Sequence, residues 1–569
     1  MNQTRTLLFF ALMFVAYLLW TEWEKDYVHP PAAPTPAAQT DSGKPGADGS
    51  LPSAAQAAGA ASVPTENPTP GEGKAELVTL SNDVLRLTID TRGGSIVRSE
   101  LLMYPTDPIT KKNPTSPPAR LLDDEGDHFF AAQNGLVSSN GAAPDHRALF
   151  SATKTDNVLA DGQKSVTLEL TWADPSGVKV TKRYTLKRTD YVVDFDQHIE
   201  NGSGAAWTGN AYEQLQRIPA AKVNWFKGYT DPAQHSFFGA ATYSPESKFE
   251  LLPFTDFEKK PMNRQISGGW VSMLQHYFFV AWIPPAGENV TYSSTIVDPN
   301  SANPRYLVRA FGPAIQVAPG QAADSTSRLY IGPKLQGTLD SIAPGLELTA
   351  NYGWFTIIAQ PLHWLLSQLH AISHNWGVAI ILLVLLIKGA LFKLTDAQFR
   401  SGARMRKLQP RVAALKERYG DDRMKMQQAM MELYKKEKVN PMAGCLPLLV
   451  TMPIFLGLLR VLSESIELRH APFFGWIHDL SAPDPFYVLP ALYFVVTLLT
   501  QRMMPTTGMD PTQAKMMKVM PLLFGVFFAF FPSGLVLYWT VNGAVSLLQQ
   551  WWINRSVDQV EATAKITKA

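Results

Sequence analysis

The order of apolar and polar residues divides the chain into a short apolar start, an alternating middle and a helical end. Residues 7–20 form an apolar run after Arg5, and Trp23 and Tyr27 follow it. A run of this length fits a membrane anchor over residues 1–28 or the core of a cleaved signal sequence. Under both interpretations the following residues are exported, and we expect a retained anchor with a cytoplasmic N-terminus.

The middle of the chain predicts a linker and then a large β domain. Residues 29–75 are rich in Pro, Ala, Gly and Ser, so they bury too little apolar surface to fold and predict a disordered linker. From 76 to 344, short runs alternate apolar and polar residues between Gly, Pro, Asn and Asp. This period of two predicts an all-β sandwich, with Gly93 and Gly94 in a hairpin turn.

Beyond residue 344 the apolar positions take on helical spacing. Residues 345–370 carry two tryptophans and apolar residues three or four apart, which predicts an amphipathic helix on the membrane surface or packed under the β domain. Longer apolar segments predict transmembrane helices at 371–394, 442–464, 485–502, 516–531 and 534–553. With the N-terminal anchor this makes six transmembrane helices in total, followed by a tail at 554–569.

A basic segment at 395–441 lies between the first two helices of this block. It contains twelve Lys and Arg against six Asp and Glu, which predicts the cytoplasmic side of the membrane. Apolar residues from Met405 to Tyr419 step by three and four, Gly420 and two aspartates interrupt them, and a second stripe begins at Met426. We expect two antiparallel helices, a cytoplasmic hairpin. Its methionines either form the hairpin core or bind apolar clients; the candidate binding residues are Met405, Arg406, Met426 and Met430.

Lys388 is a charged residue inside the predicted helix at 371–394. An ammonium in hydrocarbon costs about 2.5–3.5 kcal/mol, so Lys388 is a candidate functional residue. Alternatively, its stem reaches the lipid headgroups beside Lys393. In the last helix, polar residues at helical spacing share one face, where they either bond neighbouring helices or line a wet cavity. The candidate groove residues are Lys388, Thr451, Tyr538, Asn542 and Ser546.

Composition and motifs limit the ligands and reactions that we expect of this chain. The net charge is only +2, which predicts no general attraction to DNA, and Cys445 is the one cysteine, which excludes an intramolecular disulfide. The sequence has no phosphate-binding loop and no HExxH spacing, so we expect no cofactor, no metal and no enzymatic activity. Asp194, Asp196 and His198 alternate on one predicted strand, which suits either a catalytic edge or, more simply, a solvated face.

Several motifs in the helical half resemble the YidC/Oxa/Alb family of membrane protein insertases in its Gram-negative form. They lie between residues 350 and 555 and read NWGVAIILLVLLIKG, KERYGDD, EKVNPMAGCLPLLVTMPIFLGL, ELRHAPFFGWIHDLSAPDP and FPSGLVLYWTVN. The anchor, the linker and a periplasmic β-supersandwich correspond to the family in order and size.

The resemblance implies an insertase of the bacterial inner membrane that helps nascent membrane proteins to insert and fold, alone or with the Sec translocon. It implies a hydrophilic groove with one positive charge, open to the cytoplasm and lipid, and a hairpin that recruits clients. Both termini are then cytoplasmic. The basic hairpin and tail suggest a contact with the ribosome or with the lipid bilayer.

This chain departs from the family pattern at three positions. Lys388 stands where arginine is usual, Trp539 stands in a pair that is often two tyrosines, and Val384 stands where a hydroxyl is common. Lysine keeps the charge but lacks the forked geometry of arginine. An alternative function is a secondary transporter or channel for a small anion, against which stands the absence of an inverted repeat in the sequence.

Overall fold

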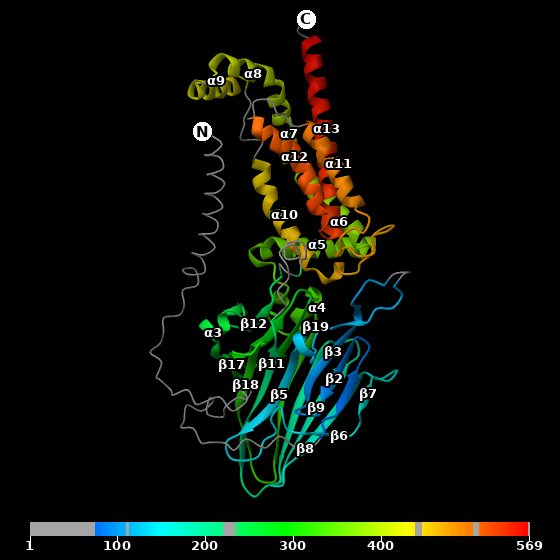
Figure 1. Cartoon of the computed structure of the whole chain (residues 1–569), viewed down its shortest axis with the longest axis vertical. Coiled ribbons are helices and arrows are strands. Elements are labelled where there is room, and N and C mark those ends of the chain that lie inside the picture. Colours follow the sequence, from blue (N-terminus) through cyan, green and yellow to red (C-terminus); the bar gives the residue numbers. More distant parts are fainter. Residues whose placement is uncertain are drawn as a thin grey trace. The chain divides into compact units, whose positions relative to one another are not determined.

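The computed structural model describes residues 74–109, 113–219, 233, 236–420, 422–437, 446–503 and 511–566. They form a β domain followed by a helical region (Figure 1). The expected anchor at 1–28 and the linker up to residue 73 lie outside the described residues, and so do residues 438–445 at the end of the predicted hairpin and the start of the next predicted helix. Those expectations stay predictions.

Two largely antiparallel sheets make up the β domain. The first sheet has ten strands among the described residues, in the spatial order β14 (Asn263–Ser267), β17 (Asn289–Val297), β18 (Arg305–Val317), β11 (Trp207–Arg217), β5 (Phe130–Ser138), β3 (Ser95–Pro105), β2 (Leu85–Asp90), β1 (Leu77–Ser81) and β7 (Asp156–Val158), with β4 (Pro118–Arg120) beside β3. The second sheet has nine, in the order β13 (Lys248–Leu252), β12 (Gly239–Ser244), β15 (Trp270–Leu274), β16 (Phe278–Ile283), β19 (Ala322–Pro333), β10 (Val192–Asn201), β9 (Val178–Lys187), β8 (Ser165–Ala173) and β6 (Ser151–Ala152).

The alternating pattern explains how the sheets form a sandwich. Along β10, Val193, Phe195, Gln197 and Ile199 are buried, whereas Asp194, Asp196 and His198 point to the other face. Apolar side chains from both sheets meet in one core that includes Tyr184, Phe195, Leu215, Trp282 and Leu329. The predicted all-β fold of this domain is therefore confirmed. The Gly93–Gly94 turn between β2 and β3 is confirmed as well, with φ angles of 73° and 65°.

The row of Asp194, Asp196 and His198 lies on the outer face of β10. Asp194 pairs with Lys187 at 2.7 Å and Asp196 with Arg183 at 3.1 Å. The Nδ1 atom of His198 lies 2.6 Å from the carboxylate of Asp324. Because each member pairs with a neighbouring strand, this row fits the interpretation as a solvated face.

A charged residue that the sequence analysis did not single out lies between the sheets. Lys182 of β9 is fully buried, and its Nζ donates to the carbonyl oxygens of Gly93 (2.7 Å) and Asn134 (3.1 Å). Asn134 donates to the hydroxyl of Tyr184 at 3.0 Å, and that hydroxyl donates to Gly94 O at 2.6 Å. Burial lowers the pKa of Lys182 to about 7. Lys182 therefore ties β9 to the β2–β3 turn and to β5 of the opposite sheet.

The stability of the β domain is expected to fall as pH rises from 5 to 7, because Glu213 on β11 is buried. Burial raises the pKa of Glu213 to about 8, from 4.5 for a free carboxyl. The unfolded chain therefore loses this proton from pH 4.5 upward, whereas the folded domain keeps it, so the folded state is disfavoured by about 2 kcal/mol over this range. Hydrogen exchange of the β11 amides at pH 5 and 7, corrected for intrinsic rates, measures this change.

The matched variant for this prediction is Glu213→Gln, which resembles the protonated carboxyl and has no proton to lose. We expect its exchange-derived free energy of opening to change much less between pH 5 and 7 than that of the parent chain. Lys182 acts in the opposite direction and only above pH 7, since its lowered pKa relieves the cost of burial as pH rises from about 7 to 10.5. A parent chain whose stability rises between pH 5 and 7 would contradict the prediction.

The helical region follows the β domain. The described helices are α3 (Asp256–Lys259) and α4 (Gln336–Ile342) within or next to the β domain, then α5 (Thr356–Ser373), α6 (Trp376–Ala390), α7 (Phe392–Lys407), α8 (Gln409–Tyr419), α9 (Arg423–Lys436), α10 (Leu446–Glu464), α11 (Val488–Met503), α12 (Pro511–Phe528) and α13 (Ser533–Ile566). Single 3-10 turns occur at Gly126–His128, Leu346–Thr349, Gly353–Phe355 and Ile466–Leu468. Helix α13 packs against α6, α7 and α11, and α5 packs against α6 and α10.

The predicted helix at 371–394 is divided among three helices. Helix α5 continues through Ser373, and His374 ends it with a left-handed φ of 52°. Asn375 then caps α6, since its side chain accepts a hydrogen bond from the amide of Val378 at 3.1 Å. A further bend after Ala390 begins α7, so the predicted segment is neither continuous nor straight.

The apolar helices of the helical region are short or bent. Within the described residues, no single helix combines the length and the hydropathy of a membrane crossing; α6 and α7 reach that length and hydropathy only together, with a bend of 69° between them. Helix α11 and the part of α12 from Val519 to Phe528 are apolar but shorter. The count of six transmembrane helices therefore stays a prediction.

The predicted hairpin is built differently from the expected helix pair. The apolar stripe from Met405 to Tyr419 was expected on one helix, but α7 ends at Lys407 and α8 begins at Gln409. The break follows from Pro410, which has no amide hydrogen to donate to the carbonyl oxygen of Arg406 four residues earlier and whose ring crowds that carbonyl. The second break is as expected, since Gly420 has a φ of 34° and Asp422 caps α9 by accepting from the amide of Lys425 at 3.2 Å. Helices α8 and α9 contact each other.

Candidate functional site

The amine of Lys388 is directed at helix α13. Its Nζ donates to the hydroxyl of Ser546 at 2.6 Å, and this hydroxyl donates to the carbonyl oxygen of Asn542 at 2.8 Å. Lys388 and Ser546 are 158 residues apart in the sequence and are both half-buried. This bond sets Lys388 against a neighbouring helix, which favours the interpretation as a bundle residue over the one in which its stem reaches the headgroups.

Two further polar features of α13 lie near this pair. Asn542 takes part through its backbone carbonyl, one turn before Ser546, and its side chain is half-buried. Gln549 follows less than one turn after Ser546, and its side-chain oxygen is buried without a hydrogen-bond partner among the described residues. The segment of α13 from 542 to 549 therefore brings polar atoms to the face that meets α6.

Tyr538 belongs to an aromatic cluster on the same helix, about 12 Å further along the axis from Ser546. It is buried, and its ring lies 6.2 Å from that of Phe455 on α10. The neighbouring Trp539 stacks on Phe528 of α12, with ring centroids 4.0 Å apart, and also contacts Phe455 at 5.9 Å. The structure thus separates two of the candidate groove residues, Lys388 and Ser546, from a third, Tyr538, which lies in the aromatic cluster.

Thr451 lies on the α10 face that leads to this cluster. It is half-buried and stands one turn before Phe455, so both residues share a face of α10. Phe455 and Phe528 were missed in the sequence analysis. The spacing of four between Thr451 and Phe455 is a signal from which Phe455 could have been found, whereas no local pattern predicts the contact between Phe528 and Trp539.

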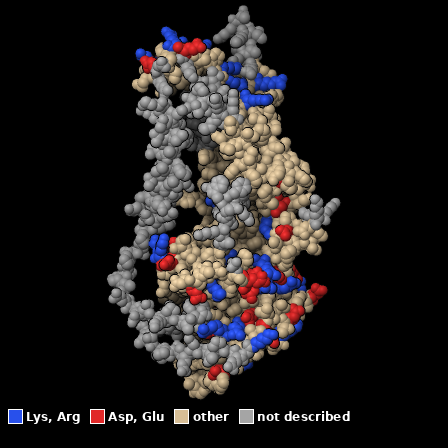
Figure 2. All heavy atoms as spheres, in the orientation of Figure 1, with Lys and Arg blue, Asp and Glu red and all other residues tan. Residues whose placement is uncertain are grey.

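Large apolar side chains are exposed on several helices of the bundle, among them α12 and α11. On α12 they are Val519, Met520, Leu522, Leu523, Phe524, Val526 and Phe527, and on α11 they are Leu492, Val495 and Leu499. Figure 2 shows a broad uncharged surface over the helices, with Lys and Arg gathered at the end where α7, α8 and α9 lie. Such a surface suits contact with lipid or with an apolar helix of another protein.

The hairpin methionines differ in their exposure. Met405 and Arg406 lie in the last turn of α7 and are half-buried, as are Met426 and Met430 on α9. Met424 is 82% exposed, although it was not among the candidate binding residues. The base of this region is held by apolar contacts, in which Phe399 and Ala403 of α7 pack against Ile553 and Val557 of α13.

Helix α5 is amphipathic, as expected, and its buried face packs on the helical bundle. Ala359 and Leu366 are buried against the bundle, and α5 packs on α6 and α10. On the opposite side Ile357, Trp364 and Ile372 are exposed, and so is Trp354 just before the helix. The helix is therefore packed on one face and presents an apolar face with tryptophans on the other, as at a membrane surface.

Comparison with known proteins relates both halves of the chain to one family. Residues 77–365 match the family model described as the YidC periplasmic domain, and residues 368–560 match that of the 60Kd inner membrane protein. The chain is 45% identical to the membrane protein insertase YidC of Xanthomonas campestris pv. campestris (strain 8004) over 592 residues, which cover all of both chains. The chain belongs to the YidC family of membrane protein insertases.

Other relatives agree with this membership. The insertase YidC of Stenotrophomonas maltophilia (strain R551-3) is 45% identical, over 98% of this chain and 97% of its own. That of Aeromonas hydrophila subsp. hydrophila is 43% identical, over 98% and 99%. Among solved structures, an active YidC insertase crystal structure with its first transmembrane domain resolved covers 84% of this chain and 92% of its own, at 18% identity and a TM-score of 0.37.

Family membership establishes the coarse function and location. The protein is a membrane protein insertase of a YidC inner-membrane family, with a β domain of the periplasmic type and a helical C-terminal region. The alternative of an anion transporter or channel is not favoured. The family often has a hydroxyl residue one turn before the groove charge, and this chain has Val384 there. The side chain of Val384 is buried in the bundle core with Ile380 and Leu383.

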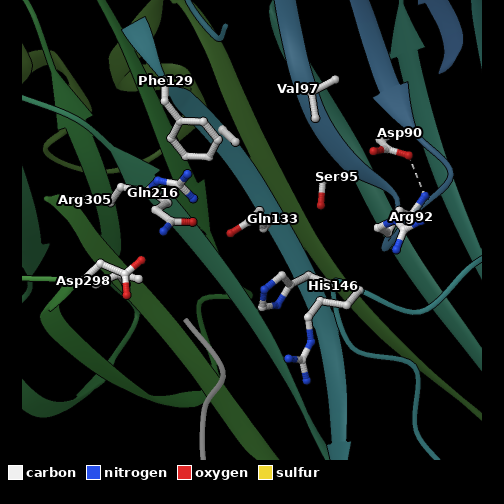
Figure 3. Close-up of a pocket in the computed structure, with 13 residues that line it drawn as sticks. Asp90, Arg92, Ser95, Val97, Phe129, Gln133, His146, Gln216, Asp298 and Arg305 are labelled. Carbon is white, nitrogen blue, oxygen red and sulfur yellow. Dashed lines mark hydrogen bonds between the residues drawn. The ribbon is translucent and has the colours of Figure 1, made fainter. Parts of the chain in front are cut away.

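A cleft of about 230 Å³ lies in the β domain of this YidC chain, away from the helical site. Figure 3 shows Phe129, Gln133, His146, Gln216 and Arg305 around it. The Arg305 guanidinium lies 4.2 Å above the Phe129 ring, and the Nδ1 atom of His146 lies 2.7 Å from the hydroxyl of Tyr212. These contacts hold the lining in place. Within the described residues, no group of His, Cys, Asp or Glu side chains is arranged to hold a metal ion.

Proposed function

We propose that Lys388 and Ser546 form the client-binding site of this insertase, at which a polar, preferably acidic, segment of a nascent membrane protein is drawn into the bundle. The observation that carries the proposal is the 2.6 Å hydrogen bond from Lys388 Nζ to Ser546 Oγ, because it directs a cation toward another helix within an apolar bundle. A polar side chain at membrane depth is tolerated where it lines a protected or hydrated cavity.

The proposed mechanism is electrostatic and needs no nucleotide. A cation in surroundings of low dielectric attracts an acidic client segment more strongly than it would in water. Ser546 holds the amine while no client is present, and a client carboxylate competes for the same hydrogens. The side-chain oxygen of Gln549, which is buried without a hydrogen-bond partner among the described residues, supports a polar path along α13. The polar segment then crosses a thinner apolar barrier, and the client's own apolar helix enters the lipid.

The exposed apolar side chains of α12 and the face of α10 that carries Thr451 are proposed to guide the client helix into lipid. We propose that the half-buried methionines and Arg406 of the hairpin contact clients first, since methionine adapts to varied apolar surfaces. The basic residues of α7 to α9 support a cytoplasmic position for this region under the positive-inside rule, and we propose that both chain termini lie on that side. The Sec translocon and the ribosome are proposed partners.

Site-specific photo-crosslinking tests this function. A photoreactive residue is placed at Thr451, at Tyr538 or at Leu492, and the chain is offered a ribosome-bound membrane protein with its first apolar segment exposed. We expect strong adducts from Thr451, which is half-buried, and weaker ones from Tyr538, which a client reaches only if the cluster with Phe455 parts. Leu492 on α11 is the exposed control. Adducts from Leu492 alone would refute the proposed client path.

A further inference from the structure

The loop from residue 465 to 487 joins α10 to α11 and contacts the first turns of three helices. At α6, the side chain of Asn375 donates to Phe473 O at 3.3 Å. Gly377 lies directly under the Phe473 ring, where a Cβ atom would come within 2.1 Å of it. The loop thus packs on the beginning of α6 with no room for a side chain between them.

The same loop is bonded to the beginning of α13. The Ser533 hydroxyl donates to Asp479 O at 2.8 Å, and the Ser533 amide donates to Ala482 O at 2.7 Å. The next amide, of Gly534, donates to Leu480 O at 2.8 Å. Ser533 and Leu480 are buried. Amides of a first helical turn lack partners within the helix, so the loop supplies their acceptors.

Two aspartates organise the loop itself. Asp479 Oδ1 accepts from the amides of His470 and Ser481, at 3.0 and 2.8 Å, and from the Ser481 hydroxyl at 2.7 Å. Asp484 is only 1% exposed. Its Oδ1 accepts from the indole of Trp476 at 2.9 Å and from the Phe486 amide at 3.0 Å, and its Oδ2 accepts from the Leu489 amide at the start of α11 at 2.7 Å.

These bonds make the loop rigid for a physical reason. A carboxylate is costly to bury unless donors surround it. Moving the loop away from α11 would remove the Leu489 donor of Asp484, and unfolding the loop would remove the Trp476 and Phe486 donors as well. Both carboxylates also lie near helix N-termini, where negative charge is favourable. The loop also contributes apolar contacts, because Leu468, Ile477 and Leu480 are buried in the same apolar core as residues of α6 and α13.

We propose that Asp479 and Asp484 are positioning residues that hold the 465–487 loop as a fixed stopper over this end of the bundle. They do not touch the client. The stopper keeps the first turns of α6, α11 and α13 together, whereas Lys388 and Ser546 lie roughly 18–20 Å further along α6 and α13. The bundle can then open toward clients at the far end while it stays closed at this one. The inference deepens the proposed function and rests on it.

Cysteine accessibility in full-length protein in membrane vesicles tests the stopper. Cys445 is replaced by serine, and Val536, which is buried one turn into α13, is replaced by cysteine as the reporter. A membrane-impermeant maleimide is added on the side of the β domain, where Arg469 at the start of the loop donates to Pro105 O of β3 at 2.8 Å. A cysteine at the exposed position Ser301 in the β domain shows that the reagent is on that side.

We expect the reporter to be nearly unreactive in the parent and labelled about tenfold faster or more in Asp484→Ala, since the loop loses charge-assisted bonds. Asp484→Asn keeps an oxygen for Trp476 and the Phe486 amide and is expected to restore most of the protection. A role confined to overall folding would show no such rescue. His478→Ala, an exposed change in the same loop, serves as the control and is expected to leave labelling unchanged.

Two milder variants keep the test decisive if Asp484→Ala does not accumulate. Trp476→Phe removes one donor to Asp484 and Ser533→Ala removes one bond to the Asp479 carbonyl, and both should raise labelling by a smaller factor. Labelling that stays at the parent level in Trp476→Phe and Ser533→Ala, with normal accumulation, would overturn the stopper. Because labelling needs no client, its result is independent of whether Lys388 variants insert proteins, so failure of either proposal is recognised separately.

Discussion

Replacing Lys388 by glutamate is expected to reduce the insertion of a client with an acidic polar tail by about tenfold or more, whereas arginine is expected to retain it. The glutamate side chain is one bond shorter than lysine, and Ser546 donates to its carboxylate only if the hydroxyl turns away from Asn542 O. The change nevertheless reverses the sign of the charge beside α13, and this reversal is the basis of the expected effect. Opposite charges at 4 Å attract by about 4 kcal/mol at an effective dielectric constant of 20, and a tenfold change needs only 1.4 kcal/mol.

Protease protection of a radiolabelled client in proteoliposomes measures this effect. Three clients that differ only in an acidic, neutral or basic tail separate charge from folding. Lys388→Met keeps the stem without the charge, and we expect it to impair the acidic client while it leaves the neutral one nearly unchanged. Ser546→Ala removes the partner of the amine but not the charge, so only a small loss is expected. Equal insertion of the acidic client by the arginine and glutamate variants would eliminate the electrostatic mechanism.

Replacing Lys182 by alanine is expected to destabilise the β domain by roughly 3–5 kcal/mol, the second largest effect. The change leaves a cavity between the sheets and deprives the carbonyl oxygens of Gly93 and Asn134 of their shared donor. Lys182→Met is the matched control, because it fills most of the volume but donates no hydrogen bond. It is expected to cost about 1–3 kcal/mol, the penalty for unpaired buried carbonyls.

Hydrogen exchange of the β5 and β9 amides in the full-length chain measures both variants, since these strands carry the two ends of the contact. Measurements at pH 8 use an amine that is mostly neutral, because burial lowers its pKa to about 7. A neutral amine still offers two hydrogens for the two carbonyls, so the expected cost persists at this pH. Unchanged protection in Lys182→Ala would show that the contact contributes nothing to stability.

The position of Lys182 shows what the alternation of apolar and polar residues can predict and what it cannot. In the run from Val178 to Tyr184, alternate residues face inward, and Lys182 falls in the inward phase with Val180 and Tyr184. The strand is recognisable from this alternation. The burial of an amine is not, because it requires two carbonyl acceptors that come from β5 and from the β2–β3 turn.

The hairpin shows the opposite case, because the proline that breaks the first helix is visible in the sequence but the helical period around it favoured one continuous helix. The stripe from Met405 to Tyr419 has a regular helical period, and that period favours one helix. Pro410 interrupts the helix at Leu408, since proline removes a backbone donor and its ring crowds the carbonyl four residues earlier. The recapping at Asp422 was predictable because the capping side chain and the glycine before it act within a few residues.

By itself, the sequence determined the succession of an alternating β domain and an apolar helical region, the basic hairpin, and the presence of a lysine among apolar residues. These features depend on the period of neighbouring residues, which is a local property. Only the tertiary structure decided that Lys388 meets Ser546, that Trp539 stacks on Phe528, and that two aspartates of one loop gather the ends of three helices. Such contacts join residues far apart in the chain, and packing, rather than periodicity, selects them.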